Sequence, residues 1–573
     1  MQVRPDSTDE RDDGAAASAR AHAFALAQAA DIRGARVAIE TFLRLVPSDG
    51  AAHRLHGATL MHTGDLPGAI EAFQRAVRFG CEDAFTRIQL GLALKFRGRC
   101  ADALREFERA AARDGADPLA RWLATVGTLP MIFDSPAAID RALAAFRSRL
   151  AELDAWFAAN GCPRADGVVA EPNPFHIAYI ETDLRADLAR YGDMCCRLMA
   201  GWSAARPRPR PQAPAIVRDR RTRVGIVTRY FYRHSVWSAI VKGMLTTLDR
   251  RRFRLDLFHV GDQRDAETDF ARAHSDSYVP SLVRTDASAD AISAAAPDIL
   301  IYPEIGMDPL STRLAALRLA PLQVASWGHP VTTGLPTVDI FLSAERLEPA
   351  DGASHYTERL VALPGLGARV ERERADATPA DPSNYGIDAA RPFFLCPGVP
   401  WKYLPHFDDA LVAISARAPL VQFVFFEPVL QLAAATQLHR RFAARCLAAG
   451  IDPAGRIVFA PWLSRSEFLG LASQAAACLD SFGFSGFNTV LQCLQAGAPM
   501  VTLEGKFMRG RLASGVLRHV GLADHVATDT PGYVERAVAC VTRRFPAGEL
   551  VAKVARAYDD REPMRALARL LSR

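Results

Sequence analysis

The chain has 573 residues, which is too long for a single hydrophobic core, so its length predicts two to four domains. Hydrophobic residues make up 49% of the sequence and charged residues 23%, as is ordinary for a soluble globular protein. Lys and Arg outnumber Asp and Glu by only five (69 − 64), and no basic tract carries interleaved aromatic residues, so nucleic-acid binding is not predicted.

The first residues, MQVRPDSTDERDDG, are charged and acidic and contain no apolar signal core. No apolar run elsewhere approaches membrane-spanning length. We therefore expect residues 1–19 to be disordered and the protein to be cytoplasmic, with no membrane partner. The ten cysteines are scattered, without a C-x-x-C pair or a Cys/His group at zinc spacing. Most of them are expected to be buried reduced thiols, and no metal site is predicted.

Residues 20–117 repeat with a period of 34. Small residues at fixed positions followed by one large apolar residue are typical of tetratricopeptide helix pairs, which have this period. The repeats stack through an apolar face. The array is either a spacer or oligomerisation element, or a groove for protein and peptide partners. The recurring positions are Gly57, Gly64, Ala69 and Phe73, then Gly91, Gly98, Ala103 and Phe107, and more weakly Ala23, Ala30, Ala35 and Ile39.

Residues 118–203 are also helical by periodicity and are predicted to form a connecting region. Residues 204–221, which contain RPRPRP and RDRR, are predicted to be a Pro/Arg-rich linker. From residue 222 the pattern changes to apolar strand-like runs alternating with helical segments. The runs are RVGIVTRYF, RLDLFHV, DILIYPE, LQVASWG, DIFLS and ERLVALPG.

A loop rich in charge and proline follows, and the alternation then restarts with PFFLCPG, LVQFVFFE, RIVFAPW, ACLDSF and PMVTLEG. Such alternation predicts doubly wound parallel sheets. The predicted fold is therefore α plus α/β: helical repeats, then two Rossmann-like lobes at 222–375 and 385–573. Ligands of such lobes bind beyond the carboxyl ends of the strands. A dehydrogenase and a P-loop NTPase are disfavoured, because neither G-x-G-x-x-G after a strand nor G-x-x-x-x-G-K-[ST] occurs.

The stretch DSFGFSGFNTVLQCLQAG runs from a strand through a polar loop into a predicted helix. The free N–H groups and positive dipole end of such a helix could hold a diphosphate, assisted by Asn488 and Thr489. The alternative is a plain helix cap, since Asn and Thr are ordinary cap residues.

Three further stretches strengthen the phosphate hypothesis. Lys402 lies where the first strand of the second half gives way to a helix, so its ammonium could face the same phosphates. His329 lies in WGHPVTTG at a strand end, and His234 follows the first strand of the first half. The alternatives are a surface lysine, a turn histidine and a helix-capping histidine.

Lys402, WGHPVTTG, the stretch 480–497 and EGKFMRGRLASGVL occur in an order and spacing similar to those of the O-GlcNAc transferase/SPINDLY family. The repeats and NPFHIAYIETD are shared as well, so the resemblance covers nearly the whole chain from about residue 20. GHPVTT and IYPEIGMD look closest to bacterial members, including relatives of the cytoplasmic adhesin N-glucosyltransferases, which carry a similar GHP-x-TT stretch.

The resemblance implies a two-lobed (GT-B type), inverting, metal-independent glycosyltransferase that uses a nucleoside diphosphate sugar as donor substrate and needs no cofactor. His234 matches the family histidine proposed as base or acceptor-positioning group, and Lys402 the lysine that contacts the diphosphate. The remaining donor-site residues carried over from matched motifs are His329, Thr332, Asp480, Gly486, Asn488, Thr489, Gln492 and Arg511.

The sequence departs from the family pattern at several positions. Gln492 stands where an Asp or Glu that binds the ribose is expected, and Ser238 where a second histidine is expected. Tyr230 replaces an Asp before His234, and Val399 replaces a glutamine often found three residues before the lysine.

With repeats that could present a polypeptide, the resemblance implies transfer of N-acetylglucosamine from UDP-GlcNAc to Ser or Thr of a protein acceptor. Transfer of glucose or another hexose, to Asn or another acceptor, is the close alternative. A repeat scaffold with an inactive transferase domain, motivated by the departures, is a hypothesis of a different class. An epimerase of the same two-lobed fold is a further alternative. The repeats could also make the protein a homo-oligomer.

Overall fold

The computed structural model describes residues 9–113, 117–127, 129–209, 211, 221–372, 376–428, 432–543 and 545–572. The chain divides into two compact units, residues 1–130 and 131–573. Within the described ranges, no helix combines the length and the apolar character that crossing a bilayer requires. Of the expected linker, residues 210 and 212–220 lie outside the described residues.

The first unit consists of antiparallel helix pairs, as the 34-residue period predicted. Its helices are α1 (Asp9–Gln28), α2 (Ile32–Leu45), α3 (Gly50–His62), α4 (Leu66–Arg78), α5 (Ala84–Phe96), α6 (Cys100–Arg113) and α7 (Pro118–Val126). The helix α7, which falls within the stretch expected to connect the repeats to the lobes, lies in this unit.

The repeated small residues have a steric reason. A Cβ added to Gly57 would lie 2.7 Å from the ring of Phe73, and one added to Gly91 would lie 2.4 Å from the ring of Phe107. Each glycine therefore lets the aromatic ring of the next helix pack against the backbone. The two glycine–phenylalanine pairs are 34 residues apart, and the same contact recurs in successive helix pairs. This recurrence confirms the predicted repeat.

The N-terminus corrects one expectation. Residues 9–19, expected to be disordered, form the first half of α1, while residues 1–8 lie outside the described residues. The stretch GAAASARAHAFALAQ is rich in alanine, the strongest helix former. Ala16 and Ala23 are buried in one apolar cluster with Ile39 and Phe42 of α2.

The second unit opens with helices α8 (Pro136–Asn160) and α9 (Arg185–Ala204) and the short 3₁₀ segment η2 (Phe175–Tyr179). A seven-stranded sheet follows, with order β3-β2-β1-β4-β5-β6-β7 and every pair parallel. Its strands are β1 (Thr222–Thr228), β2 (Phe253–His259), β3 (Ser277–Val279), β4 (Ile299–Tyr302), β5 (Leu322–Ser326), β6 (Ile340–Ala344) and β7 (Arg359–Leu363). The helices of this lobe are η3 (Trp237–Val241, of π type), α10 (Lys242–Thr247), α11 (Ala266–Ala273), α12 (Thr285–Ala295) and α13 (Pro309–Ala315).

The second lobe is built on a six-stranded parallel sheet of order β10-β9-β8-β11-β12-β13. Its strands are β8 (Phe393–Leu395), β9 (Gln422–Phe426), β10 (Ile457–Ala460), β11 (Ala477–Leu479), β12 (Met500–Leu503) and β13 (Val526–Ala527). Its helices are α14 (Pro405–Arg417), α15 (Leu432–Ala448), α16 (Arg465–Ala472), α17 (Asn488–Gln495), α18 (Leu512–His519), α19 (Thr530–Thr542) and α20 (Ala547–Asp559). Two parallel-sheet lobes after helical repeats confirm the predicted fold class.

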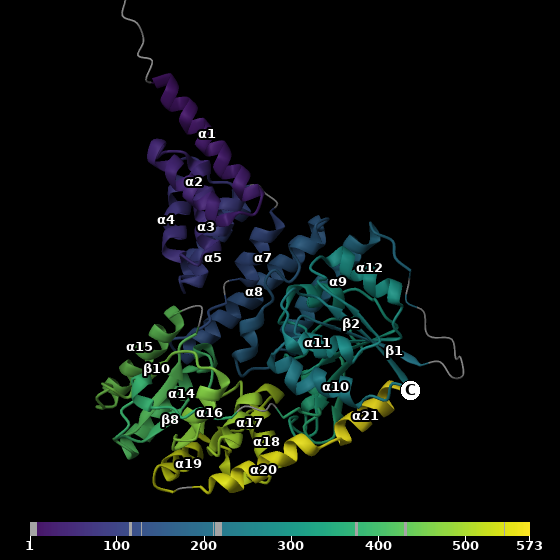
Figure 1. The fold of residues 1–573 in the computed structure, drawn as a ribbon, viewed down its shortest axis with the longest axis vertical. Coiled ribbons are helices and arrows are strands. Elements are labelled where there is room, and N and C mark those ends of the chain that lie inside the picture. The colour runs from purple at the N-terminus through teal and green to yellow at the C-terminus, as the bar shows by residue number, and fades with distance from the viewer. Residues whose placement is uncertain are drawn as a thin grey trace, which may run out of the picture. The chain divides into compact units, whose positions relative to one another are not determined.

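The last helix, α21 (Glu562–Leu571), returns to the first lobe and contacts α10 and β7 there (Figure 1). Arg252 of the first lobe also donates a hydrogen bond to Ser572, at 2.7 Å. The C-terminal end of the chain therefore ties the two lobes together.

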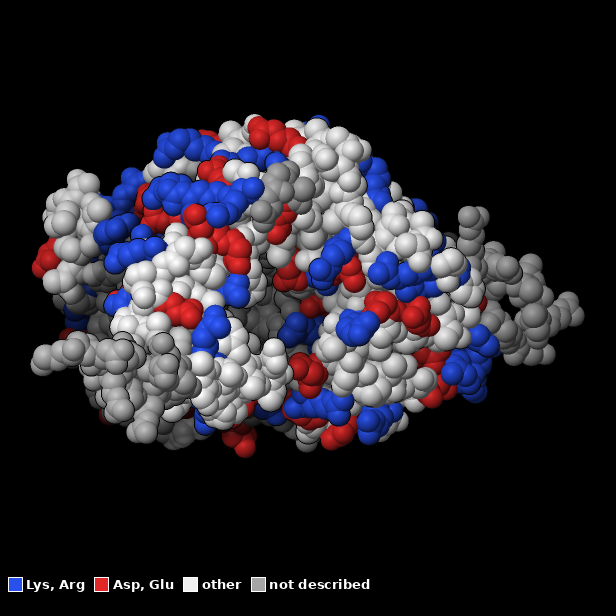
Figure 2. Space-filling view, turned by 90° about the horizontal axis from the view of Figure 1, so that it is seen from above, with Lys and Arg blue, Asp and Glu red and all other residues white. Residues whose placement is uncertain are grey.

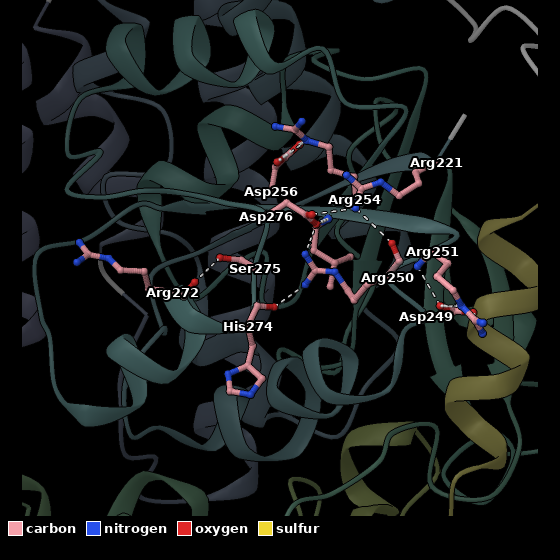
Figure 3. A network of polar contacts seen from close by, with 11 residues as sticks. Arg221, Asp249, Arg250, Arg251, Arg254, Asp256, Arg272, His274, Ser275 and Asp276 are labelled. Carbon is pink, nitrogen blue, oxygen red and sulfur yellow. Dashed lines mark hydrogen bonds and ion pairs between the residues drawn. The ribbon is translucent and has the colours of Figure 1, made fainter. Parts of the chain in front are cut away.

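A group of arginines lies near the amino-terminal ends of β1, β2 and β3 (Figure 3). This end of the first sheet is opposite the carboxyl ends of the strands. Arg221 and Arg250 both form ion pairs with Asp276, and Asp276 also accepts a hydrogen bond from the backbone of Leu255. Arg254 pairs with Asp256. These contacts brace the strand starts. On the face drawn in Figure 2, basic and acidic side chains are likewise interspersed.

Candidate active site

The order of each sheet reverses at one point, and the candidate residues follow the strands at those points. In the first sheet β1 and β4 are neighbours, and in the second sheet β8 and β11 are neighbours. Adjacent helices leave the sheet in opposite directions there, which opens a crevice beyond the strand ends. His234 follows β1, Lys402 follows β8, and Asp480 directly follows β11.

Two adjoining cavities lie between the lobes. The first, of about 190 Å³, is here named the Lys402 cavity, and the second, of about 390 Å³, the Trp462 cavity. Ser235 of the first lobe and Asn488 and Thr489 of the second line both of them. Six of the predicted site residues line one or both cavities: His234, Lys402, Gly486, Asn488, Thr489 and Gln492.

Helix α17 begins on the wall that the cavities share. Its N-cap residue is Phe487, and no side chain caps the helix. Asn488 and Thr489 are therefore first-turn residues rather than caps, which argues against the plain-cap alternative. An uncapped first turn leaves N–H groups available and carries the positive end of the helix dipole. This wall is suited to an anionic group.

Asp480 shapes the loop that leads into α17 and does not line either cavity. Its carboxylate accepts hydrogen bonds from Ser485 Oγ at 2.6 Å, Thr502 Oγ1 at 2.7 Å and the Gly486 backbone N–H at 2.9 Å. A Cβ on Gly486 would lie 2.1 Å from Thr489 Oγ1. The loop therefore needs a glycine at this position so that the threonine hydroxyl can lie against the backbone.

Lys402 ends the 3₁₀ segment η6 (Pro400–Lys402) and lines the cavity named after it. Its Nζ lies 4.9 Å from the centre of the Phe484 ring, a cation–π contact. Burial lowers the pKa of Lys402, while the negative charge of nearby Asp480 opposes that shift. Among the described residues Lys402 forms no ion pair within 4.0 Å, so its charge is available to a ligand.

His234 lines the Trp462 cavity and is half-buried. Its Nδ1 accepts a hydrogen bond from the backbone N–H of Val236 at 3.2 Å, which places the proton of the neutral ring on Nε2. Burial lowers the pKa of His234 to about 4, so the imidazole is neutral at pH 7. The residue does cap the following helix, as the alternative interpretation had it, and it also borders the cavity.

The structure turns three other predicted residues away from the cavities. His329 is buried and stacks on Phe175, with ring centroids 5.3 Å apart. Thr332 donates a hydrogen bond from Oγ1 to the buried Glu358 at 2.6 Å, and Arg511 forms an ion pair with Glu504. Each side chain has a partner within the chain that satisfies its polar or aromatic character, and the expected contact of these three residues with a donor stays a prediction.

An aromatic group that was not predicted from the sequence lines the Trp462 cavity: Phe426, Trp462 and Phe468. Trp462 keeps 59% of its surface exposed, which is unusual for so large an apolar side chain. It follows β10 by two residues and Phe426 ends β9. Both therefore satisfy the strand-end rule that selected His234 and Lys402, and that rule was the available signal.

The described residues contain no group of three or more His, Cys, Asp or Glu side chains arranged to hold a metal ion. The free cysteines include buried thiols such as Cys396 and Cys478.

Comparison with known proteins connects this geometry to a family. Residues 429–562 match the family model described as glycosyl transferase family 41. A probable UDP-N-acetylglucosamine–peptide N-acetylglucosaminyltransferase of Arabidopsis thaliana, SEC, is 25% identical over 385 residues, covering 65% of this chain and 39% of the relative. A SPINDLY protein of Petunia hybrida with the same description is 25% identical, covering 56% of this chain and 34% of the relative.

A UDP-glucose:protein N-beta-glucosyltransferase of Actinobacillus pleuropneumoniae is 24% identical, covering 42% of this chain and 37% of the relative. The chain thus spans less than two fifths of the length of these curated relatives. Among solved structures, a mutant of the Thermobaculum terrenum O-GlcNAc transferase matches with a TM-score of 0.67 and 20% identity, covering 100% of this chain and 99% of that one, so the two share a fold. Together these matches show that the chain is similar to the O-GlcNAc transferase/SPINDLY proteins and shares the fold of a bacterial O-GlcNAc transferase.

Proposed function

We propose that this protein is an inverting, metal-independent glycosyltransferase that moves N-acetylglucosamine from a UDP-sugar to Ser or Thr of a protein acceptor. The observation that carries the proposal is that Lys402 and the uncapped start of α17 line the same cavity, next to the wall that the two cavities share. Both features favour a diphosphate at the same place.

The donor's parts then fit the adjoining spaces. The diphosphate lies at Thr489 and Lys402, and the nucleoside lies in the Trp462 cavity, where aromatic side chains offer flat faces for a base. Gln492 lines that cavity and can accept a hydrogen bond from a ribose hydroxyl through its amide oxygen, without the charge of a carboxylate.

The sugar lies in the Lys402 cavity. Its walls are mostly apolar, with Val236, Ile240, Met307 and Leu512 among them. A plain hexose offers hydroxyl groups that such walls leave without partners, whereas the methyl group of an acetamido substituent gains from burial there. The lining therefore favours N-acetylglucosamine over glucose.

In the reaction the acceptor oxygen forms a bond to the anomeric carbon while the bond from that carbon to the diphosphate oxygen breaks. Negative charge develops on the departing UDP. Lys402 and the first turn of α17 both line the Lys402 cavity and can stabilise that charge, and one preorganised contact of this kind is typically worth about 10²- to 10³-fold in kcat.

His234 supplies a hydrogen bond rather than a base in this scheme. Its Nδ1 is occupied by the Val236 amide and its Nε2 carries the proton, so the neutral ring has no free acceptor nitrogen. The acceptor's proton passes instead to a phosphate oxygen of the donor, and His234 holds the reacting groups through Nε2–H.

The acceptor is proposed to be a polypeptide presented by the helical repeats, with no nucleic-acid or membrane partner. The alternative of hexose transfer to Asn is supported by the likeness to the N-glucosyltransferase. The alternative of an inactive scaffold is supported by the departures at Gln492 and Ser238. Assembly into homo-oligomers also remains a proposal.

The first test is a thermal-shift comparison of purified protein with UDP, GDP, dTDP and their common sugars, without added metal. We expect stabilisation by UDP and UDP-GlcNAc that Lys402→Ala removes. The matched control is Lys506→Ala, which removes an exposed lysine of the same lobe and should leave the shift unchanged. Stronger stabilisation by UDP-glucose than by UDP-GlcNAc would favour hexose transfer. The absence of any shift in well-folded protein would favour the scaffold.

A further inference from the structure

The loop between β1 and η3 holds two aromatic rings in face-to-face contact. The Tyr230 ring lies nearly parallel to the His234 imidazole, with centroids 3.8 Å apart and planes 14° apart. A second tyrosine of the loop, Tyr232, meets the same imidazole edge-on at 6.0 Å. Of these two tyrosines, Tyr230 is the one that covers a face of the histidine ring.

The backbone that carries Tyr230 is anchored to a buried carboxyl group. The Tyr230 N–H donates to Thr228 Oγ1 at 3.0 Å, and that hydroxyl donates to Glu304 at 2.9 Å. The Arg229 N–H donates to the same Glu304 oxygen at 3.3 Å. Glu304 is fully buried just beyond the end of β4, and burial raises its pKa to about 8. The position of the tyrosine is thus tied to the sheet and not only to the loop.

Two contacts and one cavity surround the imidazole. Tyr230 covers one face, the Val236 amide occupies Nδ1, and the residue lines the Trp462 cavity. The charged groups that share this cavity are Arg233, next to His234, and Arg465 of the second lobe. Both are cationic and neither could act as an acid–base partner for the imidazole at neutral pH.

We propose that Tyr230 is a positioning residue of the site, whose ring fixes the orientation of the His234 imidazole and excludes water from one of its faces. The role of His234 in sugar transfer rests on the proposed function. The stacking of Tyr230 on His234 is observed independently of that function. The phenol hydroxyl is not required, so phenylalanine should replace tyrosine and an aliphatic residue should not.

The test follows the histidine ring nitrogens by NMR in ¹⁵N-histidine-labelled full-length protein without substrate, with His234→Asn identifying the signal. In the native protein we expect His234 to stay in the Nε2–H form down to about pH 5, because burial lowers its pKa to about 4. Tyr230→Leu opens one face to water, so the pKa should rise toward the ordinary 6.5. Tyr230→Phe and the matched control Tyr232→Leu should behave as the native protein does.

A transfer assay then separates positioning from loss of fold. Tyr230→Leu should lower kcat about tenfold with little change in the donor KM, and Tyr230→Phe should restore it. If Tyr230→Leu does not fold, Tyr230→Met keeps the volume without a flat ring. An unchanged His234 titration in the aliphatic variant, or an equal change in Tyr232→Leu, would overturn the proposal. Native protein without transferase activity would refute the proposed function, while the NMR result would still decide the role of Tyr230.

Discussion

Asn488 Nδ2 lies 3.5 Å from the backbone carbonyl oxygen of Ser235, so the start of α17 in the second lobe touches the His234 loop of the first. The contact is long for a hydrogen bond, and its own energy is correspondingly small. Its importance lies in its place, because both residues line both cavities. It marks the point where a donor bound as proposed would pass from one cavity to the other.

The substitution Asn488→Asp tests whether the diphosphate binds beside Asn488. The carboxylate would face the Ser235 carbonyl and lie beside the proposed diphosphate, so two repulsive contacts replace an amide donor. We expect UDP binding to weaken by about 10- to 100-fold, measured by isothermal titration calorimetry. Asn488→Ala, which removes the donor without adding charge, should weaken binding only a few-fold. Equal losses in the two variants would contradict a diphosphate at this position.

Most of the fold could be predicted from the sequence because most of its strands lie within apolar runs that are longer than the strands themselves. Each run named as a strand is a strand of one of the two sheets. The strands that were missed, β3 (Ser277–Val279) and β13 (Val526–Ala527), are two or three residues long, at the outer edges of their sheets. The predicted strands β8 and β11 are equally short but lie in apolar runs, whereas β3 and β13 lie in the polar stretches DSYVPS and DHVATD. Only pairing with a neighbouring strand marks such a segment as a strand.

The sequence predicted which residues lie near the candidate site where their position depends only on the backbone topology. His234, Lys402, Asn488 and Thr489 follow strands at the points where sheet order reverses, and all four line a cavity. The direction of a side chain depends instead on partners far away in the sequence. Thr332 turns to Glu358, and His329 turns to Phe175 from the connecting region. No local pattern reveals such partners.

The role of His234 can be decided with two substitutions. If the residue acts through its Nε2–H, His234→Gln should keep kcat within about tenfold of the native value, because the glutamine amide can place a donor near the Nε2 position. His234→Ala should lose about 100-fold. Were His234 the general base, both variants would lose a similar factor, of about 10²- to 10⁴-fold. The measurement is kcat for transfer at saturating donor, with circular dichroism to check the fold.

Trp462 should contribute to nucleoside binding and not to diphosphate binding. A base stacked on an aromatic side chain typically gains about 1–3 kcal/mol, so Trp462→Ala should weaken UDP binding by at least fivefold. Binding of inorganic pyrophosphate should not change. Leu447→Ala is the matched control, because Leu447 is another exposed apolar residue of the same lobe, 66% exposed. An equal loss for UDP and pyrophosphate would show that the aromatic group does not hold the base.

His329 should make the stability of the second unit depend on acid. Burial, with a minor contribution from Arg509, lowers the pKa of His329 to about 4, below the ordinary 6.5 that applies when the chain is unfolded. Between those values the unfolded state binds the proton and the folded state does not, so stability falls as pH falls from about 6.5 toward 4 and is unaffected above that window. The loss between pH 7.5 and 4.5 is roughly 2.5 kcal/mol for this group.

His329→Phe keeps a flat ring against Phe175 and removes the titrating group. The urea midpoint of this variant should therefore drop less between pH 7.5 and 4.5 than that of the native protein, although some dependence persists because the pKa of His234 is lowered in the same way. His439→Phe, which replaces an exposed histidine, should drop as the native protein does. An identical drop of the urea midpoint in native protein and His329→Phe would mean that folded His329 binds a proton as readily as unfolded His329. The buried position stacked on Phe175 would then not be the one that His329 occupies in solution.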